Sequence, residues 1–284
     1  MPFNTLIEEY RVDSSTFNIA PQDIAVTVRW LNPIGCPTFD APIAELLHRI
    51  KQPSTQVEVV SFDMTPSPTH LEYRAYEALT YERTVHIARD CAQAGVDALV
   101  LGCFYDPALE DAREISGETL VVAPCQASLQ VAEHLANRFS IIVGRNKWIE
   151  QMRARVQGYG AGSRLASLRP LGMGVDEFQR DHAVTRRKII EQAHRAVEED
   201  GAEAIILGCT IEFGFFEEVQ REVGVPVIDP VVAAFKVAEA MAGMKRRFGW
   251  RPSRVGSCEP PPETEIERFG LFRAPAPIGN RVSA

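Results

Sequence analysis

Two cysteines, each at the end of a similar apolar stretch, are the residues of this sequence best placed to do chemistry. Cys103 ends GVDALVLGC at 95–103, and Cys209 ends GAEAIILGC at 201–209. Ligands of open α/β sheets bind beyond the carboxyl ends of the strands, where backbone N–H groups and a helix dipole favour a thiolate. Two such thiols on opposite sides of one small ligand suit the removal of a proton from one face of a carbon and its return to the other.

A structural role is the alternative for these cysteines, because cysteine is often buried as a small hydrophobe and a duplicated residue can be inherited without being used. The glycine before each one favours chemistry, since it lets other groups approach the backbone closely. We therefore predict that Cys103 and Cys209 are catalytic. No cysteine aligns in the other half with the remaining four, Cys36, Cys91, Cys125 and Cys258.

Both stretches belong to a longer internal repeat. A shift of 106 positions aligns Pro124 with Pro230 and VAEHLA at 131–136 with VAEAMA at 237–242, and about a dozen of roughly 42 aligned residues are identical. Each copy predicts a polar helix, a buried strand, an acidic helix, a second strand and another helix. This order predicts an α/β fold with two similar parallel-sheet domains related by a pseudo-twofold axis and the active site in the interdomain cleft.

Segments outside the repeat complete the expected domains. Further strands are predicted at 23–31, 56–62 and 139–144, and the helices before the cysteine strands at 72–94 and 184–200. The expected units are a first lobe (24–127 plus 231–250), a second lobe (128–230), an N-terminal arm (1–23) and a proline-rich C-terminal tail (251–284). We expect the tail to wrap the surface or a neighbouring subunit, with disorder as the alternative.

Composition excludes several classes of protein. The net charge is −8 and the single basic cluster, Lys245 to Arg247, is short, so we expect no nucleic-acid partner. We also expect no membrane span and a cytoplasmic location, because no apolar run approaches about 20 residues and the N-terminus lacks a signal-peptide pattern. The cysteines and histidines are scattered, so we expect no metal site. The sequence has no phosphate-binding or pyridoxal motif, so we expect no cofactor.

The paired motifs LGCFYDP (101–107) and LGCTIEF (207–213) resemble those of the cofactor-independent aspartate/glutamate racemase superfamily, and the first is most similar to its hydantoin and allantoin racemase branch. Weaker likenesses are LNP, SPTHLEYRAYE and VPVIDPVVAA at 31–33, 67–77 and 225–234. The resemblance covers roughly residues 24 to 245. It implies a two-cysteine racemase or epimerase without cofactor, acting on the carbon alpha to a carbonyl of a hydantoin-type ring or small amino acid.

The sequence departs from this branch at positions that line the expected pocket. Asn32-Pro33-Ile34-Gly35 stands where the branch usually has Asn-Pro-Asn-Thr, and 143–146 lacks its frequent Thr-Thr pair. Gln126 replaces a glutamate, and LGCT at 207–210 is closer to the amino-acid racemases. The substrate therefore stays open.

Three other residues are predicted to bind substrate: Asn32, Phe104 and Thr210. For Asn32 and Thr210 the alternative is turn formation and helix capping. Asp106 and Glu212 align three positions after each cysteine, and we expect them to be acids at helix N-termini. The alternative is that they tune the basicity of the cysteines or form a hydrogen bond to the ligand.

Other functions stay open on the same fold. The superfamily also contains decarboxylases and cis-trans isomerases that use one or both cysteines, and two lobes around a cleft also describe a non-catalytic binding protein. In each case the expected partner is a small molecule, and we expect a homo-oligomer.

Overall fold

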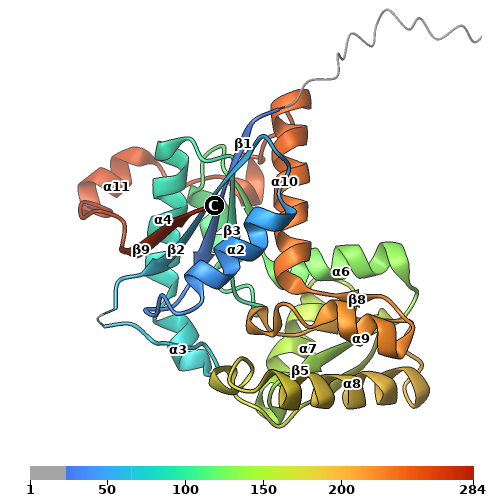
Figure 1. The fold of residues 1–284 in the computed structure, drawn as a ribbon. Helices are drawn as coiled ribbons and strands as arrows, with labels where there is room; N and C mark the ends of the chain where they lie inside the picture. The colour runs from blue at the N-terminus through green and yellow to red at the C-terminus, as the bar shows by residue number, and fades with distance from the viewer. Residues whose placement is uncertain (1–23, 65) are drawn as a thin grey trace, which may run out of the picture.

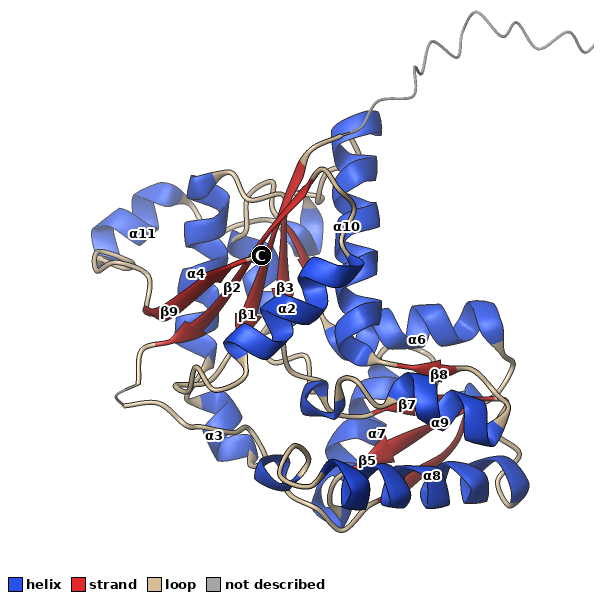
Figure 2. Cartoon of the chain, viewed as in Figure 1, coloured by secondary structure: helices blue, strands red, loops and turns tan. Residues whose placement is uncertain are grey.

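The computed structural model describes residues 24–64 and 66–284, so the predicted N-terminal arm lies outside the described residues. The described chain forms two lobes, each built on its own sheet (Figure 1). Figure 2 shows the two sets of strands separately, with helices on both sides of each.

The first lobe contains a five-stranded sheet in the order β4-β3-β1-β2-β9. Its strands are β1 (Val26–Asn32), β2 (Thr55–Phe62), β3 (Ala98–Leu101), β4 (Leu120–Val122) and β9 (Ile278–Ser283). The first four run parallel, and β9 joins the edge beside β2 in the antiparallel direction.

The second lobe contains a parallel sheet in the order β6-β5-β7-β8. Its strands are β5 (Phe139–Val143), β6 (Leu165–Pro170), β7 (Ala204–Leu207) and β8 (Val227–Ile228). The four parallel strands have the same order in both lobes, and each cysteine follows the strand next to the short edge strand. The parallel α/β prediction is confirmed, whereas the pseudo-twofold axis stays a prediction.

Helices cover both faces of each sheet, so the strands that precede the cysteines are buried along their whole length. The helices of the first lobe are α2 (Asp40–Ile50), α3 (Arg74–Ala78), α4 (Tyr81–Ala94), α5 (Leu109–Ile115) and α10 (Pro230–Phe248). Those of the second lobe are α6 (Pro124–Leu135), α7 (Ile149–Gly158), α8 (His182–Glu198) and α9 (Phe216–Val223). Apolar side chains of α2 and α10 pack on one face of the first sheet, and those of α4 and α5 on the other.

The aligned prolines of the repeat begin α6 and α10, the two helices that follow the last strand of each copy. Proline suits the first helical position because its missing N–H would have no partner there. The basic cluster lies in the last turn of α10, where Lys245 and Arg246 form ion pairs of 3.0 and 2.7 Å with buried Asp97. The cluster therefore stabilises the first lobe.

Three expectations about secondary structure need correction. The predicted helix 72–94 is two helices, α3 and α4, separated near Leu79. Strand β6 was not expected because its half-buried residues at the sheet edge form no continuous apolar run. The C-terminal tail contains a short helix, α11 (Glu263–Phe269), and β9, although its sequence shows no periodic apolar pattern.

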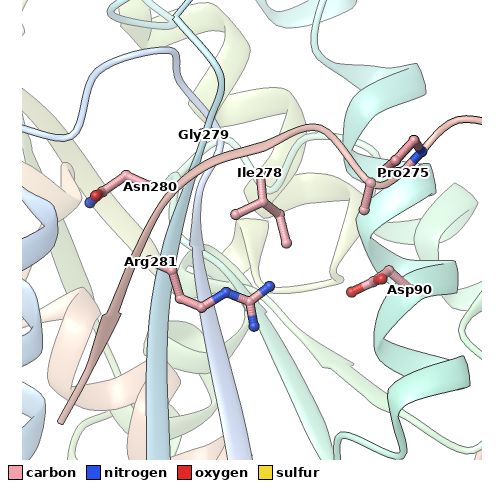
Figure 3. Close-up of a pocket in the computed structure, with 7 residues that line it drawn as sticks. Asp90, Pro275, Ile278, Gly279, Asn280 and Arg281 are labelled. Carbon is pink, nitrogen blue, oxygen red and sulfur yellow. The ribbon is translucent and has the colours of Figure 1, made fainter.

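The C-terminal tail packs on its own first lobe. Asn280 of β9 donates a hydrogen bond of 2.7 Å to Asp40, and Arg281 pairs with Glu58 of β2. Figure 3 shows a hollow beside this strand, with Arg281 on one side and Asp90 of α4 on the other. The tail was predicted to wrap either the chain's own surface or a neighbouring subunit, and in the structure it packs on the chain's own surface.

Among the described residues, no helix combines the length and apolar character needed to cross a membrane.

Candidate active site

The two cysteines occupy matching turns at the carboxyl ends of β3 and β7. The glycine before each cysteine donates its N–H to a carbonyl of the neighbouring strand, Gly102 to Leu31 and Gly208 to Ile142, both at 2.7 Å. A Cβ on Gly102 would lie 2.6 Å from the Leu31 carbonyl oxygen, closer than such atoms approach. Glycine is therefore required here to bring the cysteine backbone against the next strand.

Both thiols line one small cavity of about 40 Å³. Cys103 is half-buried and Cys209 is buried. The turns after β3 and β7, the loop before α3, and segments at the end of β5 and β6 all contribute to its wall. The lining residues are Leu71, Glu72, Cys103, Phe104, Tyr105, Trp148, Met152, Val175, Gly208, Cys209 and Thr210.

Burial controls the acidity of both thiols. It raises the pKa of Cys103 to about 12, although the backbone N–H of Tyr105 acts in the opposite direction. Burial likewise raises the pKa of Cys209 well above its ordinary value; the Glu212 charge adds to this rise, which the N–H of Ile211 opposes. The backbone N–H groups favour the thiolate, as expected, but loss of solvent outweighs them in this cavity.

Glu72 places a carboxylate in the wall of the cavity. Its Oε1 accepts a hydrogen bond of 2.9 Å from the Val175 N–H, and its Oε2 accepts one of 2.8 Å from Arg145. Burial alone would raise the pKa of Glu72, but these bonds to its charged form outweigh burial and hold the pKa below its ordinary value. Glu72 is therefore ionised at neutral pH, and its two partners belong to the second lobe.

Asp106 and Glu212, which align in the repeat, have different surroundings. The Asp106 carboxylate accepts hydrogen bonds of 2.9 Å from the N–H groups of Cys125 and Gln126 and one of 2.8 Å from the Tyr159 hydroxyl. It therefore caps α6 and not the helix that follows it in sequence. Both Glu212 carboxyl oxygens are buried, and the nearest donors in the described part of the chain are the backbone N–H groups of Gly208 and Cys209, which favour the charged form. Burial raises the pKa of Glu212 well above its ordinary value.

Two of the three predicted substrate-binding residues lie in the cavity wall. Phe104 is buried and provides apolar surface beside Cys103. Thr210 also lines the cavity, and its hydroxyl donates a buried hydrogen bond of 3.0 Å to the Gly102 carbonyl in the other lobe. The hydroxyl thus connects the two cysteine turns.

Asn32, the third predicted substrate-binding residue, is not among the residues that line the cavity. Its Oδ1 accepts a hydrogen bond of 2.8 Å from the Trp30 indole, and its Nδ2 donates one of 2.6 Å to Asp40. Asp40 also accepts hydrogen bonds from Ser61 and Asn280. In this structure Asn32 therefore belongs to a buried polar network that holds β9, and its binding role stays a prediction.

Among the remaining cysteines, buried Cys91 packs within α4, as its helical position predicts, and Cys125 is buried in the second-lobe core. Sequence analysis did not single out Glu72, Tyr105, Trp148 or Met152. Tyr105 was within reach, because it lies two positions after Cys103. No group of three or more His, Cys, Asp or Glu side chains in residues 24–64 and 66–284 is arranged to hold a metal ion.

Two features define the class of protein. The fold has two α/β lobes, and each lobe contributes one cysteine turn to a shared cavity. Comparison with known proteins identifies its family. The family model of the Asp/Glu/Hydantoin racemases matches residues 32–238, and the chain belongs to this family.

Similar proteins agree with this assignment. The chain is 34% identical to a hydantoin racemase of Pseudomonas sp. (strain NS671), over 76% of this chain and 86% of that one. It is 33% identical to the hydantoin racemase of Rhizobium meliloti, over 81% and 92% of the two chains. Among solved structures, the allantoin racemase from Klebsiella pneumoniae superimposes with a TM-score of 0.77 at 27% identity, over 84% and 94% of the chains. The protein is therefore an isomerase of the racemase type.

Proposed function

We propose that this protein is a two-cysteine racemase that acts on a hydantoin-type ring and needs no cofactor. The observation that carries the proposal is the shared cavity: Cys103 from one lobe and Cys209 from the other line the same small space. A racemase needs one group that accepts a proton and another that donates one, and a thiolate and a thiol supply both.

The proposed reaction uses the two thiols in turn. The thiolate of one cysteine removes the hydrogen from the carbon alpha to the carbonyl, and the electron pair of the C–H bond moves toward the carbonyl oxygen. The thiol of the other cysteine then returns a hydrogen to the opposite face. One thiolate and one thiol are left at the end with their roles exchanged, and the opposite enantiomer reacts in the reverse sense.

The chemistry of the cavity wall supports a ring over a free amino acid. No lysine or arginine lines the cavity among the described residues, while Glu72 is an ionised carboxylate there. The α-carboxylate of aspartate or glutamate would meet a like charge and no cation. A hydantoin-type ring is neutral, and its N–H groups can donate hydrogen bonds to a carboxylate.

Proton NMR in D₂O tests the proposal with a panel of substituted hydantoins, allantoin, aspartate and glutamate. We expect the wild-type protein to exchange the α-hydrogen and invert the stereocentre of a small substituted hydantoin, and to leave both amino acids unchanged. Preference for an amino acid would contradict the assigned ring. If no compound reacts, racemisation of this substrate class is excluded, and decarboxylation, double-bond isomerisation or binding alone must be tested.

A further inference from the structure

Two polar groups in the cavity wall have no hydrogen-bond partner. The Tyr105 hydroxyl and the Trp148 indole N–H are both buried, and neither is paired with any residue in the described ranges. Both residues line the cavity that contains the two thiols. Most buried polar atoms in proteins are hydrogen-bonded, and an unmade bond costs roughly 1–3 kcal/mol. A bound ligand that accepts hydrogen bonds would satisfy both groups.

The Tyr105 hydroxyl lies close to the reacting groups. Burial raises the pKa of this phenol far above its ordinary value, and the charges of Cys103, Cys209 and Glu72 raise it further. The phenol therefore keeps its proton throughout the accessible pH range and is available as a donor. Tyr105 lines the same cavity as both thiols, so a ring bound between the thiols lies next to this residue.

Trp148 is fixed by its surroundings, so its N–H cannot turn to another partner. The far edge of its six-membered ring packs against Gly144, where a Cβ would clash with it. The indole also makes edge-to-face contacts with Tyr105 and Phe178, with ring centroids 6.5 and 6.1 Å apart. Because the six-membered ring is held at Gly144, the N–H edge is directed away from that glycine.

We propose that the Tyr105 hydroxyl and the Trp148 N–H donate hydrogen bonds to the carbonyl oxygens of the bound ring, Tyr105 to the carbonyl next to the reacting carbon. This inference rests on the proposed function, and it adds the groups that bind the ring and stabilise its developing negative charge. As one thiolate takes the α-hydrogen, charge grows on that oxygen, and it is lost when the other thiol returns a hydrogen. Glu72, the ionised carboxylate of the cavity wall, accepts a hydrogen bond from a ring N–H.

Tyr105→Phe tests the first donor, because it removes the hydroxyl and keeps the ring. We expect kcat for racemisation of 5-methylhydantoin, followed by circular dichroism, to fall roughly 10²- to 10³-fold, with a smaller change in KM. Trp148→Phe is expected to raise KM more than it lowers kcat. Trp148 binds the other ring carbonyl, whose charge changes less during the reaction than that of the carbonyl next to the reacting carbon. Tyr159→Phe is the matched control: it loses a hydroxyl bonded to Asp106, outside the cavity, and should lower Tm without lowering kcat.

Unsubstituted hydantoin separates this inference from the proposed function, because it has no stereocentre and its binding is measurable by calorimetry without racemisation. We expect about tenfold weaker binding to Tyr105→Phe and to Trp148→Phe than to wild type. If wild type racemises hydantoins and both folded variants bind and turn over as wild type does, the donor pair is wrong and the function stands. If wild type binds the ring through these donors without racemising any hydantoin, the function is wrong and the donor pair stands. Absence of both binding and turnover in wild type overturns both.

Discussion

The turn after β3 and the turn after β7 have the same backbone plan and different side chains. In each, a fully buried strand ends at a glycine whose N–H bonds the neighbouring strand at 2.7 Å, and a cysteine follows. Beyond the cysteine the turns diverge: Phe104, Tyr105 and Asp106 in one lobe correspond to Thr210, Ile211 and Glu212 in the other.

This difference separates what both halves need from what each half supplies. The strand and glycine fix the position of a thiol, so they are present twice. The next residues have separate tasks: Tyr105 lines the cavity, Thr210 joins the two turns, and Asp106 caps α6. In the second half Asp229 caps α10 directly, with hydrogen bonds of 2.8 and 3.3 Å to Val231 and Val232. Glu212 therefore has no helix to cap.

The cysteines should be equally necessary, and this is the largest expected effect. Cys103→Ser and Cys209→Ser should each lower the rate of racemisation at least about 10³-fold, because a serine hydroxyl is a far weaker base than a thiolate. Circular dichroism of a single hydantoin enantiomer measures this loss, and Cys91→Ser, in α4, is the control. Full activity of either active-site variant would break the equivalence of the two turns.

The raised thiol pKa values predict the next largest effect, a strong dependence of activity on pH. For Cys103, with a pKa of about 12, the thiolate fraction grows about tenfold for each pH unit below that value. We therefore expect kcat/KM to increase about 100-fold from pH 7 to pH 9, with thermal melts confirming that the protein stays folded. A plateau near pH 7 would show that a thiol in the cavity has a much lower pKa than its burial produces.

Asp106 and Glu212 should differ in their effect on stability. Asp106→Asn weakens the capping of α6 and should lower the free energy of unfolding by about 1–3 kcal/mol at pH 5. Burial favours the neutral form of the Glu212 carboxyl, so the neutral replacement Glu212→Gln should lower the free energy of unfolding by less than about 1 kcal/mol. Denaturant titrations of both variants measure the difference, and equal losses would contradict the assigned roles.

The Asp106 effect should also depend on pH. Burial raises the pKa of Asp106 from an ordinary 3.8 to about 6 in the folded protein. The folded state therefore binds this proton more tightly than the unfolded state, and the associated stability is lost as pH rises through about 6. Asparagine does not titrate, so the deficit of Asp106→Asn should be larger at pH 5 than at pH 7. A deficit that grows with pH would reverse the sign of this argument.

Thr210→Val should have a modest effect on stability, about 1 kcal/mol, because it removes one buried hydrogen bond to Gly102. Thr185→Val is the matched control, since its hydroxyl donates a bond of 2.9 Å to Phe178 within the second lobe. Both variants should lose similar stability in denaturant titrations. Only Thr210→Val should lower kcat/KM, by a few fold, because only that bond joins the cysteine turns; equal kinetics would show that this link has no role in the site.

Much of the fold was predictable from the sequence because the buried strands are continuous apolar runs bounded by glycine. ALVL and AIIL were identified for this reason, and the repeat gave the parallel α/β class. Two edge strands lack that signal: β6 is half-buried, and β9 alternates between half-buried and exposed residues. Pairing of β9 with β2 depends on residues more than 200 positions apart, which no local pattern encodes.

The candidate site divides in the same way. Cys103, Cys209, Phe104 and Thr210 were predictable because they lie within the repeated turns. Glu72, Trp148 and Met152 enter the cavity from other segments, and only the folded chain brings them there. Thiol acidity was not predictable either, because it depends on how completely the lobes exclude water from the cavity.

The most direct test of the two-base account is the isotope content of both enantiomers during racemisation. One enantiomer of 5-methylhydantoin is incubated with wild-type protein in D₂O, and the reaction is stopped below about a tenth of full conversion. After correction for uncatalysed exchange, we predict deuterium at the α-carbon of the product and hydrogen in the remaining substrate, because separate thiols serve the two faces. Deuterium appearing equally in both enantiomers would contradict this account, since a single base would then serve both faces.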